Sequence, residues 1–291
     1  MLRLKEYGCP NMVSKLRAVL VRSPEFAWGK DNFEQWGYLR TPDISVAKEE
    51  HKQLVQILEG EGINVFQHDQ PINNKWDSIY TYDPTFIMER GVILLNMGKK
   101  LRRGEEVPLG QKLEDLGIPT YYTLKNDAYL EGGDTLRLAN RILAVGITYR
   151  TNQEGIKQLT IALEGFVDEV IQVQLPHYLG PSLVLHLMSV ISMVDHHKAV
   201  VYPKLTPISF LRTLKQLNIE WVETTPEEFQ THGCNVLALA PGKCLVVDGN
   251  PITRKRLETI GCDVLTYQGD EITQNGGGGP TCLTLPLLRR D

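Results

Sequence analysis

The C-terminal region contains the residues best suited to chemistry. A single cysteine, Cys282, follows four consecutive glycines at 276–279 and precedes a short apolar run. Glycine allows backbone angles that residues with a Cβ rarely adopt, and it lets main chain approach a ligand closely. A glycine loop that delivers one thiol to the start of a buried strand would present a nucleophile. A flexible tail with a buried thiol explains the same residues equally well, because free cysteine is among the most buried residue types.

A histidine and two carboxylates elsewhere in the chain could complete such a site. A thiolate needs a nearby base or cation that lowers its pKa, and His186, inside an apolar run, is the candidate. Taken alone, a hydrogen-bonded core histidine is the more ordinary interpretation. Glu131 could hold the histidine in orientation, and Asp83 could bind a cationic group of a substrate. Asp134 follows two glycines, which favours a turn residue.

These residues are widely separated, and an internal repeat predicts how the fold brings them together. Five short β-rich runs are each followed by a segment of helical periodicity and then by a further strand. We expect the first strands at 18–22, 91–95, 141–145, 198–202 and 243–247, and the helices at 45–58, 105–116, 152–163, 207–217 and 251–260. The further strands are expected at 63–66, 118–122, 169–173, 219–222 and 263–267, and one more run before each hairpin at 85–87, 134–138, 183–194, 235–239 and 282–288.

The repeated unit is therefore strand–strand–helix–strand, used five times. Each unit buries little alone, whereas five together can close around an axis. We expect one α/β domain over residues 1–291, with radial pseudo-symmetry, short strands within and helices outside. Asp83, Glu131, His186 and Cys282 stand at matching points of the repeat, next to the innermost strands. Matching positions should converge on the axis, so a ligand would bind there, at a central channel.

Composition excludes several classes of protein. The 291 residues are 42% hydrophobic and 23% charged, which is ordinary for a globular protein. The net charge of −4 lacks the excess of positive charge that is typical of proteins that bind nucleic acid. No apolar run approaches the roughly 20 residues of a membrane span, and the N-terminus lacks the apolar core of a signal peptide. We therefore expect a cytoplasmic protein that binds neither nucleic acid nor membrane.

The five cysteines point to reduced thiols. Their number is odd and they are sparse for this length, which fits a cytoplasmic protein better than a disulfide framework. His232, Cys234 and Cys244 could be imagined as zinc ligands, but no paired C-x2-C spacing supports them. Scattered small core residues explain them better, so we expect no metal site.

Six short motifs, taken in order, resemble the guanidino-group-modifying (pentein) superfamily. The chain is most similar to dimethylarginine dimethylaminohydrolases and next to arginine deiminases, from about residue 18 to residue 290. Each motif is weak alone, and the set is specific. The motifs are Tyr82-Asp83-Pro84, Arg102-Arg103-Gly104-Glu105, Glu131-Gly132-Gly133-Asp134, Tyr149-Arg150-Thr151-Asn152-Gln153, His186-Leu187-Met188-Ser189 and Gly279-Pro280-Thr281-Cys282. The resemblance implies a five-bladed α/β propeller.

The resemblance also implies a covalent mechanism without a metal or an organic cofactor. Cys282 matches the nucleophile, His186 the general acid and base, and Glu131 a carboxylate beside them. The cysteine would attack the central carbon of a guanidinium while the histidine protonates the departing amine. The histidine would then deprotonate water, which releases a ureido product from the thiouronium intermediate.

Four further residues match positions that bind the substrate in the family. Asp83 matches the aspartate that binds the guanidinium, and Asp77 one near the substrate amino group. Arg102 and Arg150 match arginines that grip the carboxylate of an amino-acid substrate, which suits a planar bidentate donor. Surface salt bridging is the alternative explanation for Asp77 and the two arginines.

The chain also departs from the family pattern. Met188 stands where arginine deiminases carry an aspartate, and Tyr82 where dimethylargininases often carry a second acid. A pocket with fewer carboxylates would suit an alkylated guanidine better than free arginine. Thr281, before the cysteine, resembles dimethylargininases rather than the His-Cys of deiminases and amidinotransferases. The segment 26–32 corresponds to a loop that can act as a lid, or it is a plain loop.

The resemblance therefore implies a hydrolase that cleaves a C–N bond of a substituted guanidino compound. Nω-methylated arginine, giving citrulline and a methylamine, is the expected substrate. The alternatives are an arginine deiminase or an amidinotransferase, and, from another class, a non-catalytic guanidino-binding protein. The partner is a small guanidino molecule. Superfamily members are often dimers, so a homodimer is a further expectation on which the residues give no signal.

Overall fold

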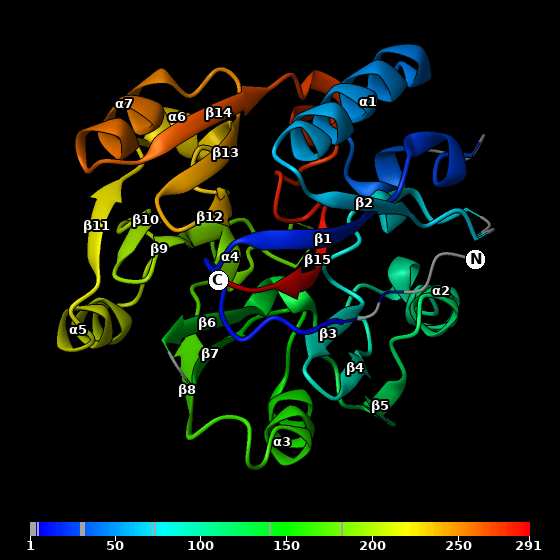
Figure 1. Cartoon of the computed structure of the whole chain (residues 1–291), viewed down its shortest axis with the longest axis horizontal. Coiled ribbons are helices and arrows are strands. Elements are labelled where there is room, and N and C mark those ends of the chain that lie inside the picture. The colour runs from blue at the N-terminus through cyan, green and yellow to red at the C-terminus, as the bar shows by residue number, and fades with distance from the viewer. Residues whose placement is uncertain are drawn as a thin grey trace.

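Five small sheets of identical topology make up the core of the molecule. The computed structural model describes residues 4, 6–29, 33–70, 72, 74–139, 141–181 and 183–291. Within them, every sheet has three strands, with a middle strand antiparallel to one neighbour and parallel to the other. Figure 1 shows the sheets set around the middle of the molecule, with the longer helices toward the outside.

The sheets follow the chain in order. In strand order they are β15 (Leu285–Arg289), β1 (Leu16–Val21) and β2 (Asn64–Gln67); β3 (Thr85–Met88), β4 (Gly91–Leu94) and β5 (Thr120–Thr123); β6 (Thr135–Ala139), β7 (Ile142–Ile147) and β8 (Glu169–Gln174); β9 (Ile191–Asp195), β10 (Lys198–Val201) and β11 (Glu220–Glu223); and β12 (Leu237–Ala240), β13 (Lys243–Val247) and β14 (Asp263–Tyr267). The C-terminal strand β15 pairs with β1, so the two ends of the chain share a sheet (Figure 1).

Each middle strand reaches its parallel neighbour through a helix, because parallel strands cannot be joined by a tight turn. The five connecting helices are α1 (Ile44–Gly60), α2 (Glu106–Asp115), α3 (Gln153–Ala162), α5 (Ile208–Gln216) and α7 (Pro251–Thr259). Side chains fix where two of them begin. Asp43 accepts hydrogen bonds from the N–H groups of Ser45 and Val46, and Asn152 accepts one from the N–H of Gly155. The five predicted helices are confirmed within two residues at each end.

Apolar clusters join each sheet to the next. One cluster lies between every pair of consecutive sheets, and a fifth lies between the last sheet and the first. In each cluster, residues from the middle strands of two neighbouring sheets come together. The pairs are Leu20 with Val92, Ile93 with Leu143, Ala144 with Ala199, Val200 with Val246, and Leu245 with Val19. Adjacent residues of one strand thus face two different clusters, as the alternation of side chains in a strand requires.

Two predicted strands differ from the structure. Residues 183–194 were expected as one strand, but α4 (Leu187–Val190) precedes β9. The helical turn forms because Ser189 Oγ accepts the N–H of His186 (3.1 Å) and Asp134 accepts the N–H of Leu187 (2.9 Å). The last strand begins at Leu285, so Cys282 lies in the turn before it rather than at its start.

Several short helical elements were not predicted. Among them are α6 (Pro226–Gln230) and the π-helical turn η6 (Asp270–Asn275), which precedes the glycine run. The first N–H groups of η6 donate to the carboxylate of Glu50 on α1, a contact 220 residues away in sequence. No helix of the described ranges has both the length and the apolar character needed to cross a membrane.

Candidate active site

One cavity, of about 90 Å³, is lined by all seven residues predicted for the site. They are Asp77, Asp83, Arg102, Glu131, Arg150, His186 and Cys282. Each lies at or beside the end of a strand or a short helical turn. Asp77 lies in η3 (Trp76–Ile79), Arg102 ends η4 (Lys100–Arg102), and Glu131 precedes η5 (Gly132–Asp134). The repeat therefore brings residues from four of its units to one place.

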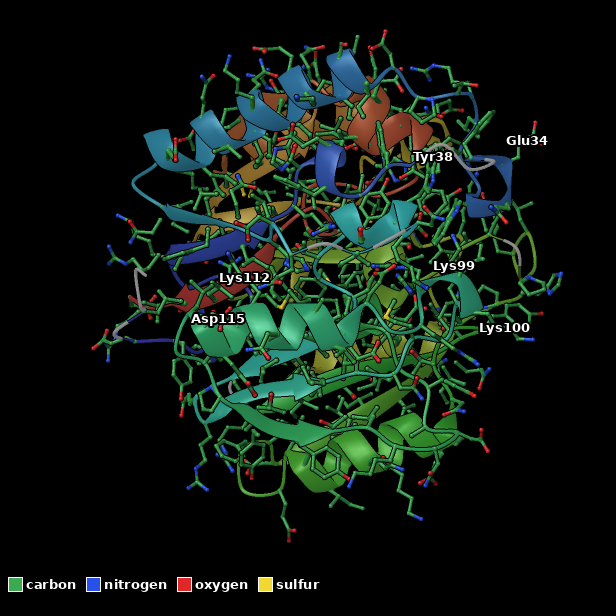
Figure 2. The ribbon with its side chains drawn as sticks, turned by 90° about the vertical axis from the view of Figure 1, so that its right-hand side faces the viewer. Glu34, Tyr38, Lys99, Lys100, Lys112 and Asp115 are labelled. Carbon is green, nitrogen blue, oxygen red and sulfur yellow. The ribbon has the colours of Figure 1, made fainter. Side chains whose placement is uncertain are left out.

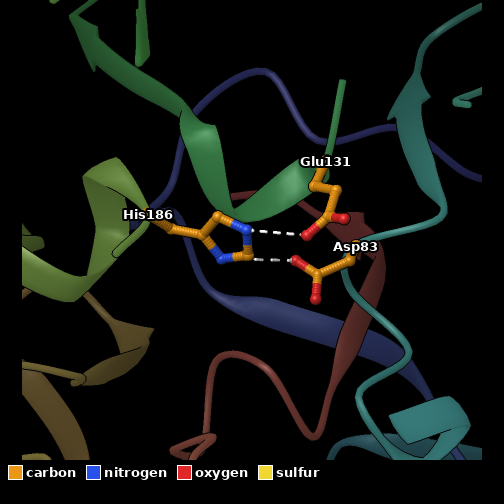
Figure 3. A group of neighbouring side chains, drawn as sticks. All are labelled: Asp83, Glu131 and His186. Carbon is orange, nitrogen blue, oxygen red and sulfur yellow. Dashed lines mark hydrogen bonds and ion pairs between the residues drawn. The ribbon is translucent and has the colours of Figure 1, made fainter. Parts of the chain in front are cut away.

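His186 faces two carboxylates in this cavity. Figure 3 shows Glu131 and Asp83 on the same side of the imidazole ring, with one ring nitrogen toward Glu131. His186 Nε2 is 2.8 Å from Glu131 Oε2, and Nδ1 is 3.9 Å from Asp83 Oδ1. The ring also lies against Gly133, where an added Cβ would be 2.3 Å from Nδ1. Glycine is therefore required at this position, and its N–H donates to Asp83 Oδ1 (3.0 Å).

The charges around His186 favour its protonated form. Burial would lower its pKa, but the carboxylates of Asp134, Asp83 and Glu131 raise the pKa to about 9. Burial would conversely raise the pKa of Glu131, yet the hydrogen bond from His186 and the charge of Arg150 hold it below its ordinary value. At neutral pH the pair is thus an imidazolium beside a carboxylate, and the histidine carries a proton that it can donate.

The surroundings of Cys282 favour the neutral thiol. Burial and the charge of Asp83 raise its pKa to about 11, while hydrogen bonds from Asn235 and Thr281 oppose the rise. Asn235 Nδ2 donates to Cys282 Sγ (3.4 Å), and Asn235 Oδ1 accepts from Thr281 N (3.1 Å) and Thr281 Oγ1 (2.7 Å). Sequence reasoning missed Asn235. It lies just before β12, a position that carried no recognisable motif.

The glycine run is packed and ordered by two tyrosines. An added Cβ at Gly276 would lie 2.1 Å from Tyr80 Oη, and one at Gly278 would lie 2.4 Å from the Tyr80 ring. Tyr38 also touches Gly276, and Tyr80 Oη donates to the carbonyl of Ile272 (3.2 Å). Gly276 and Gly278 are therefore needed because aromatic rings occupy the space of their side chains. This arrangement supports the interpretation as a thiol-presenting loop over that of a flexible tail.

Arg102 is deeply buried beneath the cavity. Its Nη1 donates to Asp83 Oδ2 (2.5 Å), its Nε and Nη2 donate to Glu105 Oε2 (3.0 and 2.8 Å), and Nη2 also donates to the carbonyl of Tyr80 (2.9 Å). Nearly all of its five N–H donors are thus occupied. Arg102 neutralises and orients Asp83, and its predicted role in gripping a substrate carboxylate stays a prediction.

Arg150 is better placed to meet a substrate. Its Nη1 lies 3.4 Å from both carboxylate oxygens of Glu131, and no residue of the described chain accepts from its Nε or Nη2. Glu131 is held from its other side by the backbone N–H of Lys99, at 2.9 Å from Oε1. Arg150 therefore keeps donors free while it fixes the carboxylate that orients His186.

Asp77 is paired with a lysine that the sequence did not single out. Lys99 Nζ donates to Asp77 Oδ2 (2.6 Å) and to the carbonyl of Trp36 (2.7 Å), and all three residues line the cavity. Asp77 Oδ1 is buried and has no partner among the described residues. Figure 2 shows Lys99 beyond one end of α2, with Tyr38 above it. The cavity thus keeps one unsatisfied acceptor beside a cation.

The two departures from the family pattern lie outside the cavity. Tyr82 and Met188 are both buried in the apolar cluster that joins β6 and β7 to β9 and β10, and neither lines the site. The apolar part of the cavity comes instead from Trp36, Leu183 and Val184. The expectation of a partly apolar pocket therefore has a basis in these residues, not in the two substitutions.

Asp134 does more than form a turn. It lies in η5, as a turn residue would, but it is fully buried, and burial raises its pKa to about 6. Oδ1 accepts the N–H of Leu187, and Oδ2 accepts the hydroxyls of Thr148 (2.7 Å) and Thr151 (2.6 Å). Asp134 therefore anchors the segment that carries His186.

The predicted lid is only partly described. Residues 30–32 of the segment 26–32 lie outside the described residues. Trp28 stacks on Trp76 with ring centroids 6.0 Å apart, and its Nε1 donates to Tyr38 Oη (3.0 Å). These contacts hold the described part against the wall of the site. The lid role stays a prediction.

One group of side chains in the described chain could hold a metal ion by proximity, namely Asp83, Glu131 and His186, whose ligand atoms lie within 4.8 Å of one another. The two carboxylates already bind arginines, and His186 is protonated by its surroundings, so the group suits proton transfer and cation binding better. His232, Cys234 and Cys244 form no such group. Both cysteines belong to the apolar core, and all five cysteines are free.

Asn235 provides a first test of the thiol environment. We expect Asn235→Asp to keep the bonds to Thr281 but to replace the N–H donor by a negative charge beside Sγ. The pKa of Cys282 should rise by about one unit, which corresponds to about tenfold slower alkylation at a fixed pH. The measurement is the rate of iodoacetamide labelling of Cys282 by mass spectrometry, with the exposed substitution Asp168→Asn as control. An unchanged rate would mean that Asn235 only supports the loop.

Comparison with known proteins gives the family context. A sequence model described as "N,N dimethylarginine dimethylhydrolase, eukaryotic" matches residues 31–289. A curated arginine deiminase of Latilactobacillus sakei is 24% identical over 296 residues, a match covering 87% of this chain and 69% of that protein.

Solved structures match along nearly the whole chain. A dimethylarginine dimethylaminohydrolase from Pseudomonas aeruginosa, a cysteine-to-serine mutant complexed with citrulline, superimposes with a TM-score of 0.75 at 20% identity, covering 94% of this chain and all of that one. SxtG, an amidinotransferase from Microseira wollei in the saxitoxin biosynthetic pathway, gives a TM-score of 0.82 at 19% identity, covering 98% of both chains. At these identities the likeness concerns the α/β fold.

Proposed function

The chain belongs to the N,N dimethylarginine dimethylhydrolase family, and from that premise we propose that it hydrolyses Nω-methylated arginine to citrulline and a methylamine. Its relatives are guanidino-group hydrolases, which makes it an enzyme of the pentein superfamily. The proposal rests on one cavity, which is lined by the thiol of Cys282, by the imidazolium of His186 and by the carboxylates of Asp83 and Glu131 that His186 faces.

We also propose that the five sheets close into one five-bladed propeller, with residues 1–291 as a single domain. The five apolar clusters support this, because they link each sheet to the next and the fifth sheet back to the first. The pairing of β15 with β1 supplies the closing strand. The site would then lie at the axis of the ring.

Binding of a cation would activate the nucleophile. In the empty site burial and the charge of Asp83 keep the proton on Cys282. A guanidinium placed beside Asp83 offsets that charge and stabilises the thiolate, so the pKa of the thiol falls when the substrate is bound. Asn235 Nδ2 provides a further donor to the thiolate sulfur. The reactive form would therefore arise only when a substrate is present.

Two steps then follow, each using His186. The thiolate attacks the central guanidinium carbon, and the bond to the methylated nitrogen breaks as the imidazolium gives its proton to the departing amine. His186, now neutral, takes a proton from water, and the resulting hydroxide attacks the thiouronium carbon and releases Cys282 and citrulline. The Glu131 carboxylate stabilises the imidazolium at the start and end of the cycle.

The remaining polar groups suit the amino-acid end of the substrate. Arg150 and Lys99 have donors for the α-carboxylate, and the unpartnered Asp77 Oδ1 can accept a hydrogen bond from the α-amino group. Trp36, Leu183 and Val184 provide apolar surface for N-methyl groups. This apolar lining favours a methylated substrate over unsubstituted arginine.

Arginine deiminase activity is the second candidate, favoured by the identity shared with the Latilactobacillus deiminase. An amidinotransferase would use the same covalent intermediate and an amine in place of water. A non-catalytic binding protein is disfavoured, because such a protein needs neither the thiol nor the histidine.

Product analysis with a panel of substrates separates these candidates. Arginine, monomethylarginine, asymmetric dimethylarginine and simple alkylguanidines are each incubated with the wild type and with Cys282→Ser, and products are identified by mass spectrometry. We expect citrulline and methylamine or dimethylamine from the methylated arginines, with none from the variant. A wide preference for arginine would favour the deiminase. Turnover only when an amine acceptor is added would favour the transferase.

A further inference from the structure

Two arginines outside the lining of the Cys282 cavity lack acidic partners. Within the described chain, no carboxylate oxygen lies within 4.0 Å of Arg137 on β6 or Arg289 on β15. Arg289 is 3% exposed, and its guanidinium donates once, to the carbonyl of Ser14 (2.9 Å). Arg137 is partly buried, donates once to the carbonyl of Ile87 (2.6 Å) and lies over the Phe86 ring, 3.9 Å from its centroid.

Two other buried arginines, Arg22 and Arg102, are better satisfied. Arg102 is paired with two carboxylates. Arg22 also lacks a carboxylate, but it donates to four acceptors, namely Ser78 Oγ and the carbonyls of His68, Gln70 and Phe26. A guanidinium has five N–H donors, and a buried cation without compensation is costly. Arg137 and Arg289 thus retain donors that the fold does not use.

Both arginines line one small cavity, of about 20 Å³, with Tyr82, Cys9 and Thr85. Thr85 Oγ1 is buried and has no partner in the described part of the chain. Burial raises the pKa of Cys9 and of Tyr82, so both are neutral at pH 7. Burial, with the nearby charge of Arg137, lowers the pKa of Arg289 to about 10, which leaves it a cation. The cavity therefore offers two positive charges and a free hydroxyl without a counter-charge.

A larger hollow of about 330 Å³ adjoins this cavity. The two share Cys9, Phe86 and Arg137. Most of the remaining lining is apolar, from Met88, Ile142, Leu163, Phe166 and Val167. Glu89 and Arg141 also line the hollow, so it carries one further charge of each sign. Its size and lining suit a short hydrocarbon body attached to the anionic group. None of the residues that line the Cys282 cavity lines either of these two hollows.

We propose that this second cavity binds a small organic acid with a short apolar body. Its carboxylate lies between Arg137 and Arg289, accepts their unused N–H donors and accepts the Thr85 hydroxyl. Its apolar body occupies the adjoining hollow. Tyr82 and Thr85 flank Asp83-Pro84 in sequence, and Tyr82 N donates to the carbonyl of Cys282 (3.3 Å). Occupancy therefore stabilises the segment that carries the catalytic-site aspartate.

Calorimetry and thermal unfolding of the full chain test this proposal in Tris-chloride at constant ionic strength. The probes are hexanoate, its neutral analogue hexanamide, and inorganic phosphate. We expect saturable binding of hexanoate and a rise in Tm, at least about tenfold weaker binding of hexanamide, and weaker binding of phosphate, which lacks the apolar body. Absence of saturable hexanoate binding, equal binding of hexanamide, or binding of phosphate alone overturns the proposal.

Variants locate the site. Arg137→Met and Arg289→Met should each weaken hexanoate binding at least about tenfold, while the exposed control Arg254→Met should leave it unchanged. Without ligand, Arg289→Met should be no less stable than the wild type, because it removes an uncompensated buried charge. Should a methionine variant fail to fold, Arg137→Lys keeps the charge, loses the planar fork and should still weaken binding. Undiminished affinity in the folded variants places the acid elsewhere and overturns the proposal.

Discussion

Replacement of Cys282 by serine is expected to lower kcat for the methylated arginines by roughly 10⁴-fold or more. The hydroxyl of serine is a far weaker acid than a thiol, and the cavity offers no neutral base to deprotonate it, because His186 is already protonated. Binding should persist, since the charges that meet the substrate are untouched. The measurement is product release, together with substrate-induced change in Tm. Retention of more than a tenth of the activity would exclude Cys282 as the nucleophile.

A labelling experiment tests separately whether a bound cation activates the Cys282 thiol. Chloroacetamidine and chloroacetamide have nearly the same shape, but the first is a cation. Burial and the charge of Asp83 together raise the pKa of Cys282. Because the cation offsets the charge of Asp83, it should label Cys282 at least about tenfold faster at pH 7. Asp83→Asn should abolish most of that preference. Equal labelling rates in the wild type would contradict activation of the thiol by the substrate cation.

The fold was largely predictable because it repeats. Each unit shows a buried middle strand, an amphipathic helix and a closing turn, so the same periodicities recur five times. The stretch before β9 was predicted wrongly, since nine of the twelve residues from Leu183 to Val194 are apolar and periodicity alone does not separate a buried strand from a helical turn. The turn depends on Asp134, which lies 53 residues away from the N–H it accepts.

The residues that line the cavity were predictable where they belong to recognisable sequence motifs. All seven proposed residues line one cavity. Asp83, Glu131, His186 and Cys282 were expected together because they stand at matching points of the repeat, whereas Asp77, Arg102 and Arg150 were identified only by family motifs. Lys99 and Asn235 were missed, and each acts through a contact that only the folded chain creates, with Asp77 and with Cys282 respectively. Local sequence carries no signal for such partners. The partners also change how motif residues are understood, since Arg102 is occupied by Asp83 rather than free.

A second large effect is expected from Glu131→Gln, which removes the carboxylate that is hydrogen-bonded to His186. In the wild type the pKa of His186 is raised to about 9, so the imidazolium that protonates the leaving amine is lost only as the pH rises through that value. In the variant the pKa should fall toward the ordinary value of about 6.5. The alkaline limb of kcat/KM against pH should therefore move down by one unit or more, with about a tenfold or larger loss of activity at pH 8.

Glu105→Gln is the matched control, because Glu105 is another buried carboxylate near the site that pairs with Arg102 instead of His186. It should leave the alkaline limb in place even where it changes KM.

The raised pKa of His186 also affects the stability of the folded protein. A histidine whose pKa is raised in the folded state contributes stability that is fully present below about 6.5 and is lost as the pH rises through about 9. Urea unfolding at pH 6 and pH 10 should therefore show a smaller difference for Glu131→Gln than for the wild type. An unmoved alkaline limb together with an unchanged difference would mean that Glu131 does not set the protonation of His186, and that Asp83 and Asp134 alone hold the proton on the ring.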